Sequence, residues 1–235
     1  MTQIKERPIL FSAPMVRAIL EGRKTVTRRV VKGDQIPRLC KGGGERPWVA
    51  VGQHGRRYGF VVSASTEDEC AAQLGAFGAC PYGRRGDRLW VRETTEIDEQ
   101  TGDGVVLSRY SADGEPVLYS GSNAPEYDGT VAHWDYPRRS RPSIHMPRWA
   151  SRILLEITDV RVERLQDISP EQVTAEGVGT RGEAMWGSRW WVDAPDQAIE
   201  DARMDFADLW SSINGAESWK ANPWVWVVEF KRVQP

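Results

Sequence analysis

The stretch Gly22-Arg23-Lys24-Thr25-Val26-Thr27-Arg28-Arg29 joins a predicted helix to a predicted strand, and the rest of the chain is interpreted around it. The preceding segment 14–21 opens with proline, which suits a first helical turn, and carries apolar residues on one face. Gly22 is typical of the residue just past a helix end. The β-branched residues of 25–31 favour a strand. The basic residues either complement the negative end of the helix dipole in solvent or contact a ligand.

Length and composition limit the class of protein. The chain has 235 residues, a hydrophobic fraction of 40% and a formal net charge of −2. A chain of this length can build a hydrophobic core without disulfides. No apolar run approaches the roughly 18 residues of a membrane-spanning helix, and no basic-then-apolar signal pattern begins the sequence. We therefore expect a cytoplasmic protein with no membrane partner. The oligomeric state is not indicated.

The sequence holds few cysteines and histidines that could bind a metal. Cys40, Cys70 and Cys80 do not suggest a disulfide framework. Together with His54 they lack the paired short spacing that is typical of structural zinc sites. The sequence therefore predicts neither a metal nor another cofactor.

Basic residues are concentrated in two stretches. Segment 17–38 holds seven Lys or Arg against two acids, and segment 138–152 holds five Arg and no acid. Such segregation permits a local basic surface on a nearly neutral protein. In the second stretch Trp149 lies among the arginines, which suits phosphates and stacked bases. The alternative is a solvated loop that Trp149 anchors to the core.

Three separated blocks together resemble the ASCH family, which belongs to the PUA-like group of small β-barrels. They are Gly22-Arg23-Lys24-Thr25-Val26-Thr27-Arg28-Arg29, Gly86-Asp87-Arg88-Leu89-Trp90-Val91 and Trp224-Val225-Trp226-Val227-Val228-Glu229-Phe230. The chain resembles phage and prophage ASCH proteins more closely. The features that carry this resemblance are Cys80-Pro81-Tyr82-Gly83, Ser143-Ile144-His145-Met146-Pro147-Arg148-Trp149-Ala150 and Ser211-Ser212-Ile213-Asn214-Gly215. The resemblance implies an α+β fold: one PUA-like β-barrel domain over 1–235 with peripheral helices. Two large insertions are expected, at about 33–82 and 94–140, and a phage origin would place the protein in the bacterial host cytoplasm.

The resemblance also implies a hydrolytic site. Some small ASCH proteins are amidohydrolases that remove acyl groups from the N4 amine of cytidine, using a Lys, a Thr three residues later and a Glu. Those residues correspond to Lys24, Thr27 and Glu176 here. Thr27 could attack with Lys24 as base, although an ordinary Lys pKa is about 10.4. Alternatively, a charged Lys24 stabilises the oxyanion and Glu176 handles the proton through water. The sequence leaves both divisions open.

A binding module for RNA, single-stranded DNA or a modified base is the alternative function, with nuclease activity as a third. The partner is in each case a nucleoside or a nucleic acid. The expected substrate or nucleic-acid contacts are Arg23, Arg28, Arg29, Arg138, Arg139, Arg141, Arg148 and Trp149. Segment 181–192 adds three tryptophans, which are either a stacking platform or a lid over the core.

Overall fold

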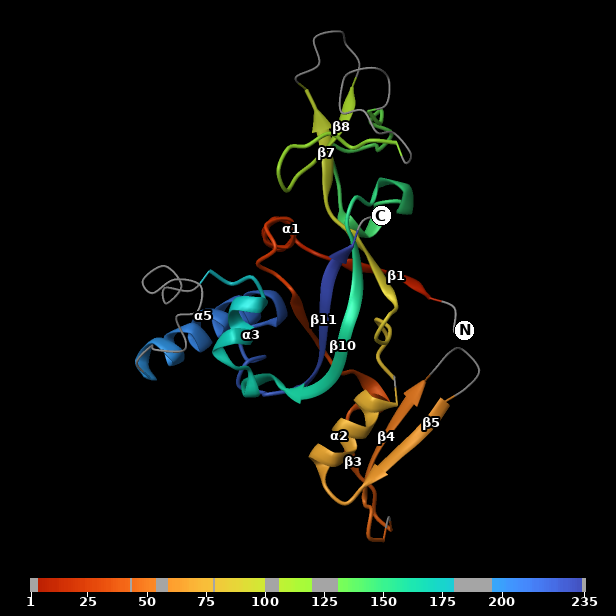
Figure 1. The fold of residues 1–235 in the computed structure, drawn as a ribbon, viewed down its shortest axis with the longest axis vertical. Helices are drawn as coiled ribbons and strands as arrows, with labels where there is room; N and C mark the ends of the chain where they lie inside the picture. The colour runs from red at the N-terminus through yellow and green to blue at the C-terminus, as the bar shows by residue number, and fades with distance from the viewer. Residues whose placement is uncertain are drawn as a thin grey trace. The chain divides into compact units, whose positions relative to one another are not determined.

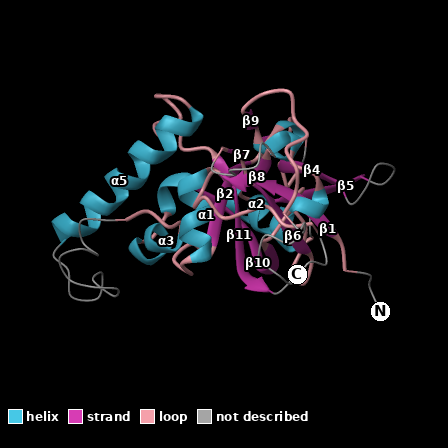
Figure 2. Ribbon diagram, turned by 90° about the horizontal axis from the view of Figure 1, so that it is seen from above, coloured by secondary structure: helices cyan, strands magenta, loops and turns pink. Residues whose placement is uncertain are grey.

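The computed structural model describes residues 4–42, 44–53, 59–77, 79–99, 106–119, 131–179 and 196–233, so the tryptophans of 181–192 lie outside the described residues. The chain divides into two compact units. Unit 1 comprises Met1–Gly22, Asp87–Glu156 and Arg232–Pro235, and unit 2 comprises Arg23–Gly86 and Ile157–Lys231. The secondary structure of the described residues is drawn in Figures 1 and 2. Whether the chain is one domain with two insertions stays a prediction.

Unit 1 contains the predicted first helix and the strands that follow Gly86. Strand β1 (Glu6–Leu10) pairs in parallel with β6 (Arg88–Arg92), which pairs antiparallel with the start of β10 (Leu154–Arg164). Helix α1 (Ala13–Leu20) has a proline in its first turn and ends before Gly22, whose φ of 77° requires the left-handed region that glycine tolerates. The helix predicted over 14–21 is therefore confirmed.

A separate three-stranded sheet lies in the second segment that was predicted to be an insertion. Its strand order is β8-β7-β9, with β7 at Thr95–Asp98, β8 at Leu107–Tyr110 and β9 at Ser140–Arg141. Short 3-10 turns follow β9, at Ser143–His145 and Arg148–Ala150. The buried side chains of Tyr110, Val117, Ala132, Met146 and Ala150 form a small core here.

Unit 2 is built around the strand that the opening stretch predicts. That strand, β2 (Val26–Val30), pairs antiparallel with β11 (Trp224–Val233), which is followed in the sheet by β10. Helices α3 (Pro170–Ala175) and α5 (Asp196–Asn214) contact one another and lie on one side of these strands (Figure 1). Short 3-10 turns occupy Gly33–Gln35 and Leu165–Asp167.

The other predicted insertion contributes a second sheet to unit 2. Strands β3 (Arg38–Leu39), β4 (Trp48–Gln53) and β5 (Gly59–Ala64) pair in that order, antiparallel throughout. Helix α2 (Glu67–Ala76) follows, and the Thr66 hydroxyl caps it by accepting from the backbone N–H of Glu69.

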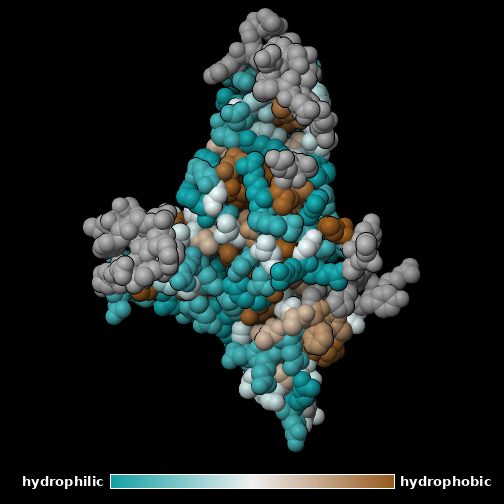
Figure 3. Space-filling model, viewed as in Figure 1, coloured by the Kyte–Doolittle hydropathy of each residue, from teal (hydrophilic) through white to brown (hydrophobic). Residues whose placement is uncertain are grey.

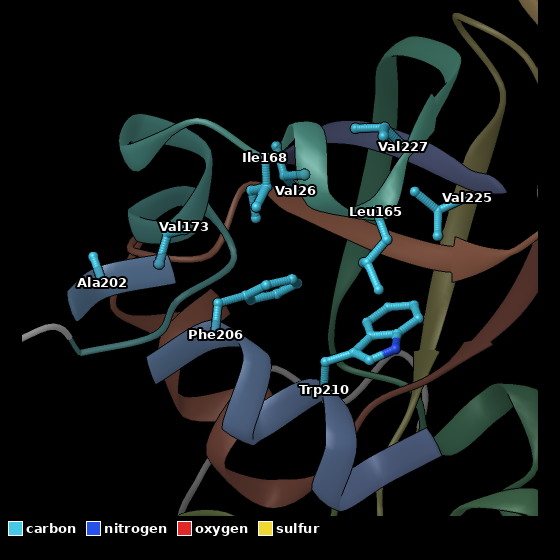
Figure 4. Packing of buried hydrophobic residues seen from close by; sticks show 9 residues of the cluster. All are labelled: Val26, Leu165, Ile168, Val173, Ala202, Phe206, Trp210, Val225 and Val227. Atoms are coloured by element: carbon cyan, nitrogen blue, oxygen red, sulfur yellow. The ribbon is translucent and has the colours of Figure 1, made fainter. Parts of the chain in front are cut away.

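A hydrophobic core of unit 2 lies between the helices and one face of β2 and β11. Figure 4 shows Phe206 and Trp210 of α5 projecting toward Leu165 and the valines of β11. Val225 and Val227 share this face because side chains two apart along a strand point the same way. The core comprises Val26, Leu165, Ile168, Val173, Ala202, Phe206, Trp210, Val225 and Val227. Packing on this face fixes which side chains of β2 meet α3.

The predicted α+β class is confirmed. Within the described ranges no strand pairing closes a sheet into a barrel. None of the helices in that part of the chain is both long and apolar enough to cross a bilayer.

Candidate active site

The end of α3 is tied to the residues that precede β2. Ser169 and Gln172 form a capping box that starts the helix, and Gly177 ends it with a φ of 80°. The backbone N–H of Thr25 donates to the carbonyl oxygen of Ala175 at 2.8 Å. This bond places the side chain of Lys24 next to Glu176, which is the helix C-cap.

Lys24 is buried in a pocket of hydrogen-bond acceptors. Its Nζ donates to the Val26 carbonyl oxygen at 2.8 Å, the Glu176 carbonyl oxygen at 2.8 Å and Glu176 Oε2 at 2.7 Å. Its side chain is 0% exposed. Three acceptors around one nitrogen fit the ammonium, which has three protons to donate, better than the neutral amine, which has two.

Burial and the neighbouring carboxylate act in opposite directions on Lys24. Loss of hydration lowers the pKa of Lys24 from its ordinary 10.5, and the nearby Glu176 carboxylate opposes that change. Desolvation is the larger cause, so the pKa of Lys24 is lowered overall. Lys24 is thus an ammonium that gives up its proton more readily than an exposed lysine.

Arg28 holds the other oxygen of Glu176. Its guanidinium donates to Glu176 Oε1 at 3.2 Å and to Gln172 Oε1 at 2.6 Å, and lies 3.5 Å from Glu163 Oε2. The side chain is 1% exposed. Arg161 extends this network by pairing with Glu163 and Glu229. Glu176 is therefore a buried carboxylate held between two cations.

Thr27 lies on the opposite face of β2. In the register, Arg28 is opposite Val227 and Thr27 is opposite Val228. Val227 faces the core beneath α5, and directly opposed residues share a face, so Arg28 points toward α3 and Thr27 points away from it. Thr27 is buried, at 2% exposed. The fold therefore brings Lys24 and Glu176 together and leaves Thr27 on the other side of the strand.

The remaining residues expected to bind nucleic acid are divided between the two units. In unit 2, Arg23 donates to the Gly177 carbonyl oxygen. Arg29 lies near Tyr82; burial raises the pKa of Tyr82, and the charge of Arg29 opposes that rise. In unit 1, Arg138 is exposed and Arg139 pairs with Glu99.

The last three of those residues make contacts within unit 1. Arg141 is buried, pairs with Asp135 and lies over the rings of Trp134 and Tyr136. Arg148 pairs with Glu6 at 3.0 Å, and Trp149 stacks on Tyr119 at 5.3 Å. A basic surface common to both units stays a prediction.

Sequence reasoning missed a second buried ion cluster, in unit 1. Arg152 donates to both carboxylate oxygens of Glu93 at 2.9 Å, pairs with Asp113 at 2.8 Å and lies 3.8 Å from the Tyr110 ring centre. Glu93 is 1% exposed, and burial raises its pKa above the ordinary value while Arg152 opposes that change. The arginine-rich pattern around Arg152 was a signal, but its partner is 59 residues away in the sequence.

No metal-binding group of His, Cys, Asp and Glu occurs among the residues that the structure describes. Comparison of the chain with family models, curated proteins and solved structures produced no match.

Proposed function

We propose that the chain is an amidohydrolase that removes an acyl group from N4-acylated cytidine or from a related modified nucleoside or nucleic acid. The observation that carries the proposal is the contact of Lys24 with Glu176, a buried ammonium–carboxylate pair 2.7 Å apart between residues 152 positions apart. These are two of the three residues that the ASCH resemblance selects. A PUA-like fold of the ASCH type and a cytoplasmic location belong to the same proposal.

The contacts favour one of the two divisions of roles. Because three acceptors surround Nζ of Lys24, the residue rests as an ammonium, which can stabilise an oxyanion but cannot accept a proton. Glu176 is then the proton acceptor. An oxyanion reaches Lys24 by taking the place of one of its acceptors.

Water is the attacking group in this proposal, because Thr27 faces away from Arg28 and Glu176. The water oxygen bonds to the acyl carbon, one water proton passes to Glu176, and Lys24 stabilises the resulting oxyanion. The carbon–nitrogen bond then breaks, and the proton passes from Glu176 to N4. The products are cytidine and the carboxylic acid.

Arg28 has a positioning role in this scheme. It was expected to contact phosphate, but its guanidinium is engaged by Glu176, Gln172 and Glu163. By holding Glu176 Oε1, it leaves Oε2 directed at Lys24. An Arg is suited to this because its rigid fork fixes a carboxylate in one orientation.

A panel of N4-acylated cytidines, presented as free nucleosides and within single-stranded oligonucleotides, tests the proposal. Purified protein is incubated with each compound, and free cytidine is measured by chromatography. We expect release from at least one member of the panel and a loss of release in Lys24→Met. Absence of release from every member by folded wild-type protein would refute the proposed activity.

The binding-module alternative receives limited support from the arginines first selected for it. Arg139, Arg141 and Arg148 each pair with a carboxylate, which reduces the positive charge that a phosphate would meet. Arg138, Arg139 and Arg148 are all exposed, and Arg141 is buried. The nuclease alternative stays a prediction.

A further inference from the structure

A cavity of about 350 Å³ lies in unit 2, where the end of α2 meets β10. We call it the Phe77 pocket; its lining includes Phe77, Gly83, Arg84, Arg85, Asp159 and Val160. Gly75, which also lines the cavity, approaches the backbone of Arg161 so closely that an added Cβ would lie 3.3 Å from the Arg161 Cα. The volume falls in the range of about 300–1,000 Å³ that is typical of small-molecule sites.

The pocket carries positive charge. Arg84 and Arg85 are both exposed and lie in a turn bounded by Gly83 and Gly86, whose φ values are 131° and 86°. Asp159 is the one acid among the lining residues that the structure describes, and it pairs with Arg161 at 3.0 Å. Arg85 forms no ion pair with any other residue that the structure describes. An anion, and a phosphate above all, suits two adjacent guanidinium groups.

The pocket also presents an aromatic ring. Phe77 is 57% exposed and lies edge-to-face with Phe60, with 6.0 Å between ring centres. Val61, on neighbouring β5, is 66% exposed. Hydrophobic atoms gather over this part of the surface in Figure 3. An exposed ring held by a second ring is a surface on which a planar base stacks.

A second cavity, in unit 1, differs from the Phe77 pocket in the charge and the aromatic content of its lining. It is of similar size, about 340 Å³, and is lined by Arg109 and Arg139. There each arginine pairs with a glutamate of the lining, Arg109 with Glu96 and Arg139 with Glu99. Among the described residues of its lining there is no excess positive charge to attract an anion and no aromatic ring.

We propose that the Phe77 pocket binds one nucleotide of a single-stranded nucleic acid, with its base on Phe77 and its phosphate at Arg84 and Arg85. A single strand is required because a base can reach the ring only when it is unstacked. This inference deepens the proposed function, since it makes a polymer the substrate. The alternative is that Arg84 and Arg85 only complement the negative end of α2.

Fluorescence anisotropy with a labelled single-stranded 12-mer, as RNA and as DNA, tests the pocket. We expect Phe77→Ala to weaken binding by roughly 5- to 150-fold, the range typical of one stacked base. Arg84→Ala/Arg85→Ala should weaken it and lower the slope of log affinity against log salt concentration by about 1.4, for two lost phosphate contacts. Phe77→Leu should behave like Phe77→Ala, because it keeps apolar bulk without a π face.

The control variant Arg38→Ala/Lys41→Ala removes two exposed positive charges that do not line the pocket. We expect it to leave affinity almost unchanged. Equal losses in both double variants, wild-type affinity in Phe77→Leu, or tighter binding of a duplex or an acidic peptide would overturn the proposal. Hydrolysis of N4-acylated cytidine, both free and within the 12-mer, is measured in parallel for wild-type protein and the pocket variants. Failure of hydrolysis with intact pocket-dependent binding would refute the amidohydrolase and leave this inference standing.

Discussion

Two buried ion clusters, one in each unit, hold a glutamate in similar surroundings and with different partners. In unit 1, Arg152 occupies both oxygens of Glu93 and lies on the Tyr110 ring. In unit 2, Lys24 and Arg28 each occupy one oxygen of Glu176. Both glutamates are almost inaccessible, at 1% and 7% exposed.

The difference lies in the type of cation and in how it holds the carboxylate, since Arg152 takes both oxygens of Glu93 while Lys24 and Arg28 take one oxygen each of Glu176. A guanidinium keeps its proton at every ordinary pH, so Arg152 can only hold Glu93 in place. The Lys24 ammonium has a pKa that burial lowers, and its neighbour Glu176 can accept a proton. We therefore interpret the Glu93 cluster as structural and the Glu176 cluster as chemical.

Removal of Arg152 should have the largest effect on stability. In Arg152→Ala, Glu93 remains buried without its bidentate partner, a change that typically costs about 3–5 kcal/mol. Lys24→Met should cost less, because Arg28 still holds Glu176. Urea denaturation measures both. A greater loss in Lys24→Met would contradict this view of the two clusters.

Removal of Lys24 should have the largest effect on turnover. Lys24→Met should lower the rate of amide hydrolysis by about 100- to 1000-fold, as the loss of one oxyanion donor does. Lys32→Met is the matched control, because Lys32 is an exposed lysine of the same unit. Chromatographic rates at equal folded concentration make the comparison. Similar rates in the two variants would exclude Lys24 from the reaction.

The pH dependence separates the two roles of Lys24. If the ammonium is the active form, turnover falls as pH rises through the lowered pKa of Lys24; if the amine were the base, turnover would rise there. Between that pKa and 10.5 the unfolded chain binds the extra proton, so this group makes the folded state more stable as pH rises. As pH rises, turnover should therefore fall while the contribution of Lys24 to the free energy of unfolding rises. A pH–rate profile measures the first, and denaturation at several alkaline pH values measures the second.

Thr27 should matter least. Because its side chain faces away from Arg28, Thr27→Ala should change turnover by less than about 10-fold, whereas loss of an attacking residue costs up to about 10⁶-fold. Steady-state rates of Thr27→Ala and Thr27→Ser distinguish water from Thr27 as the attacking group. Activity that is lost in the first and partly kept in the second would replace water by Thr27 as the attacking group.

Local sequence signals predicted local structure well. Proline before an apolar face and Gly22 after it placed α1, and the β-branched run after Gly22 placed β2, because these preferences act within a few residues. The site depends on longer-range packing. The capping box of Ser169 and Gln172 determines where α3 begins, but nothing local in the sequence shows that α3 ends against Thr25.

The face of Thr27 shows why a motif alone does not define a site. Its three-residue spacing from Lys24 is the same in any conformation, and only the register of β2 against β11 directs Arg28 and Thr27 to opposite sides. In the same way, the burial of Arg28 follows from α3 and α5 covering its face of the sheet.

The most direct test replaces each buried glutamate by its neutral isostere and measures hydrolysis. Glu176→Gln and Glu93→Gln each remove one carboxylate charge from a buried ion cluster, so they share the structural cost and differ in the chemistry. Rates of cytidine release from N4-acylated cytidine are compared at equal folded concentration, which thermal melting establishes. We predict that Glu176→Gln loses hydrolysis while Glu93→Gln keeps it. Equal rates in the two variants would contradict the assignment of the chemistry to the Lys24–Glu176 pair.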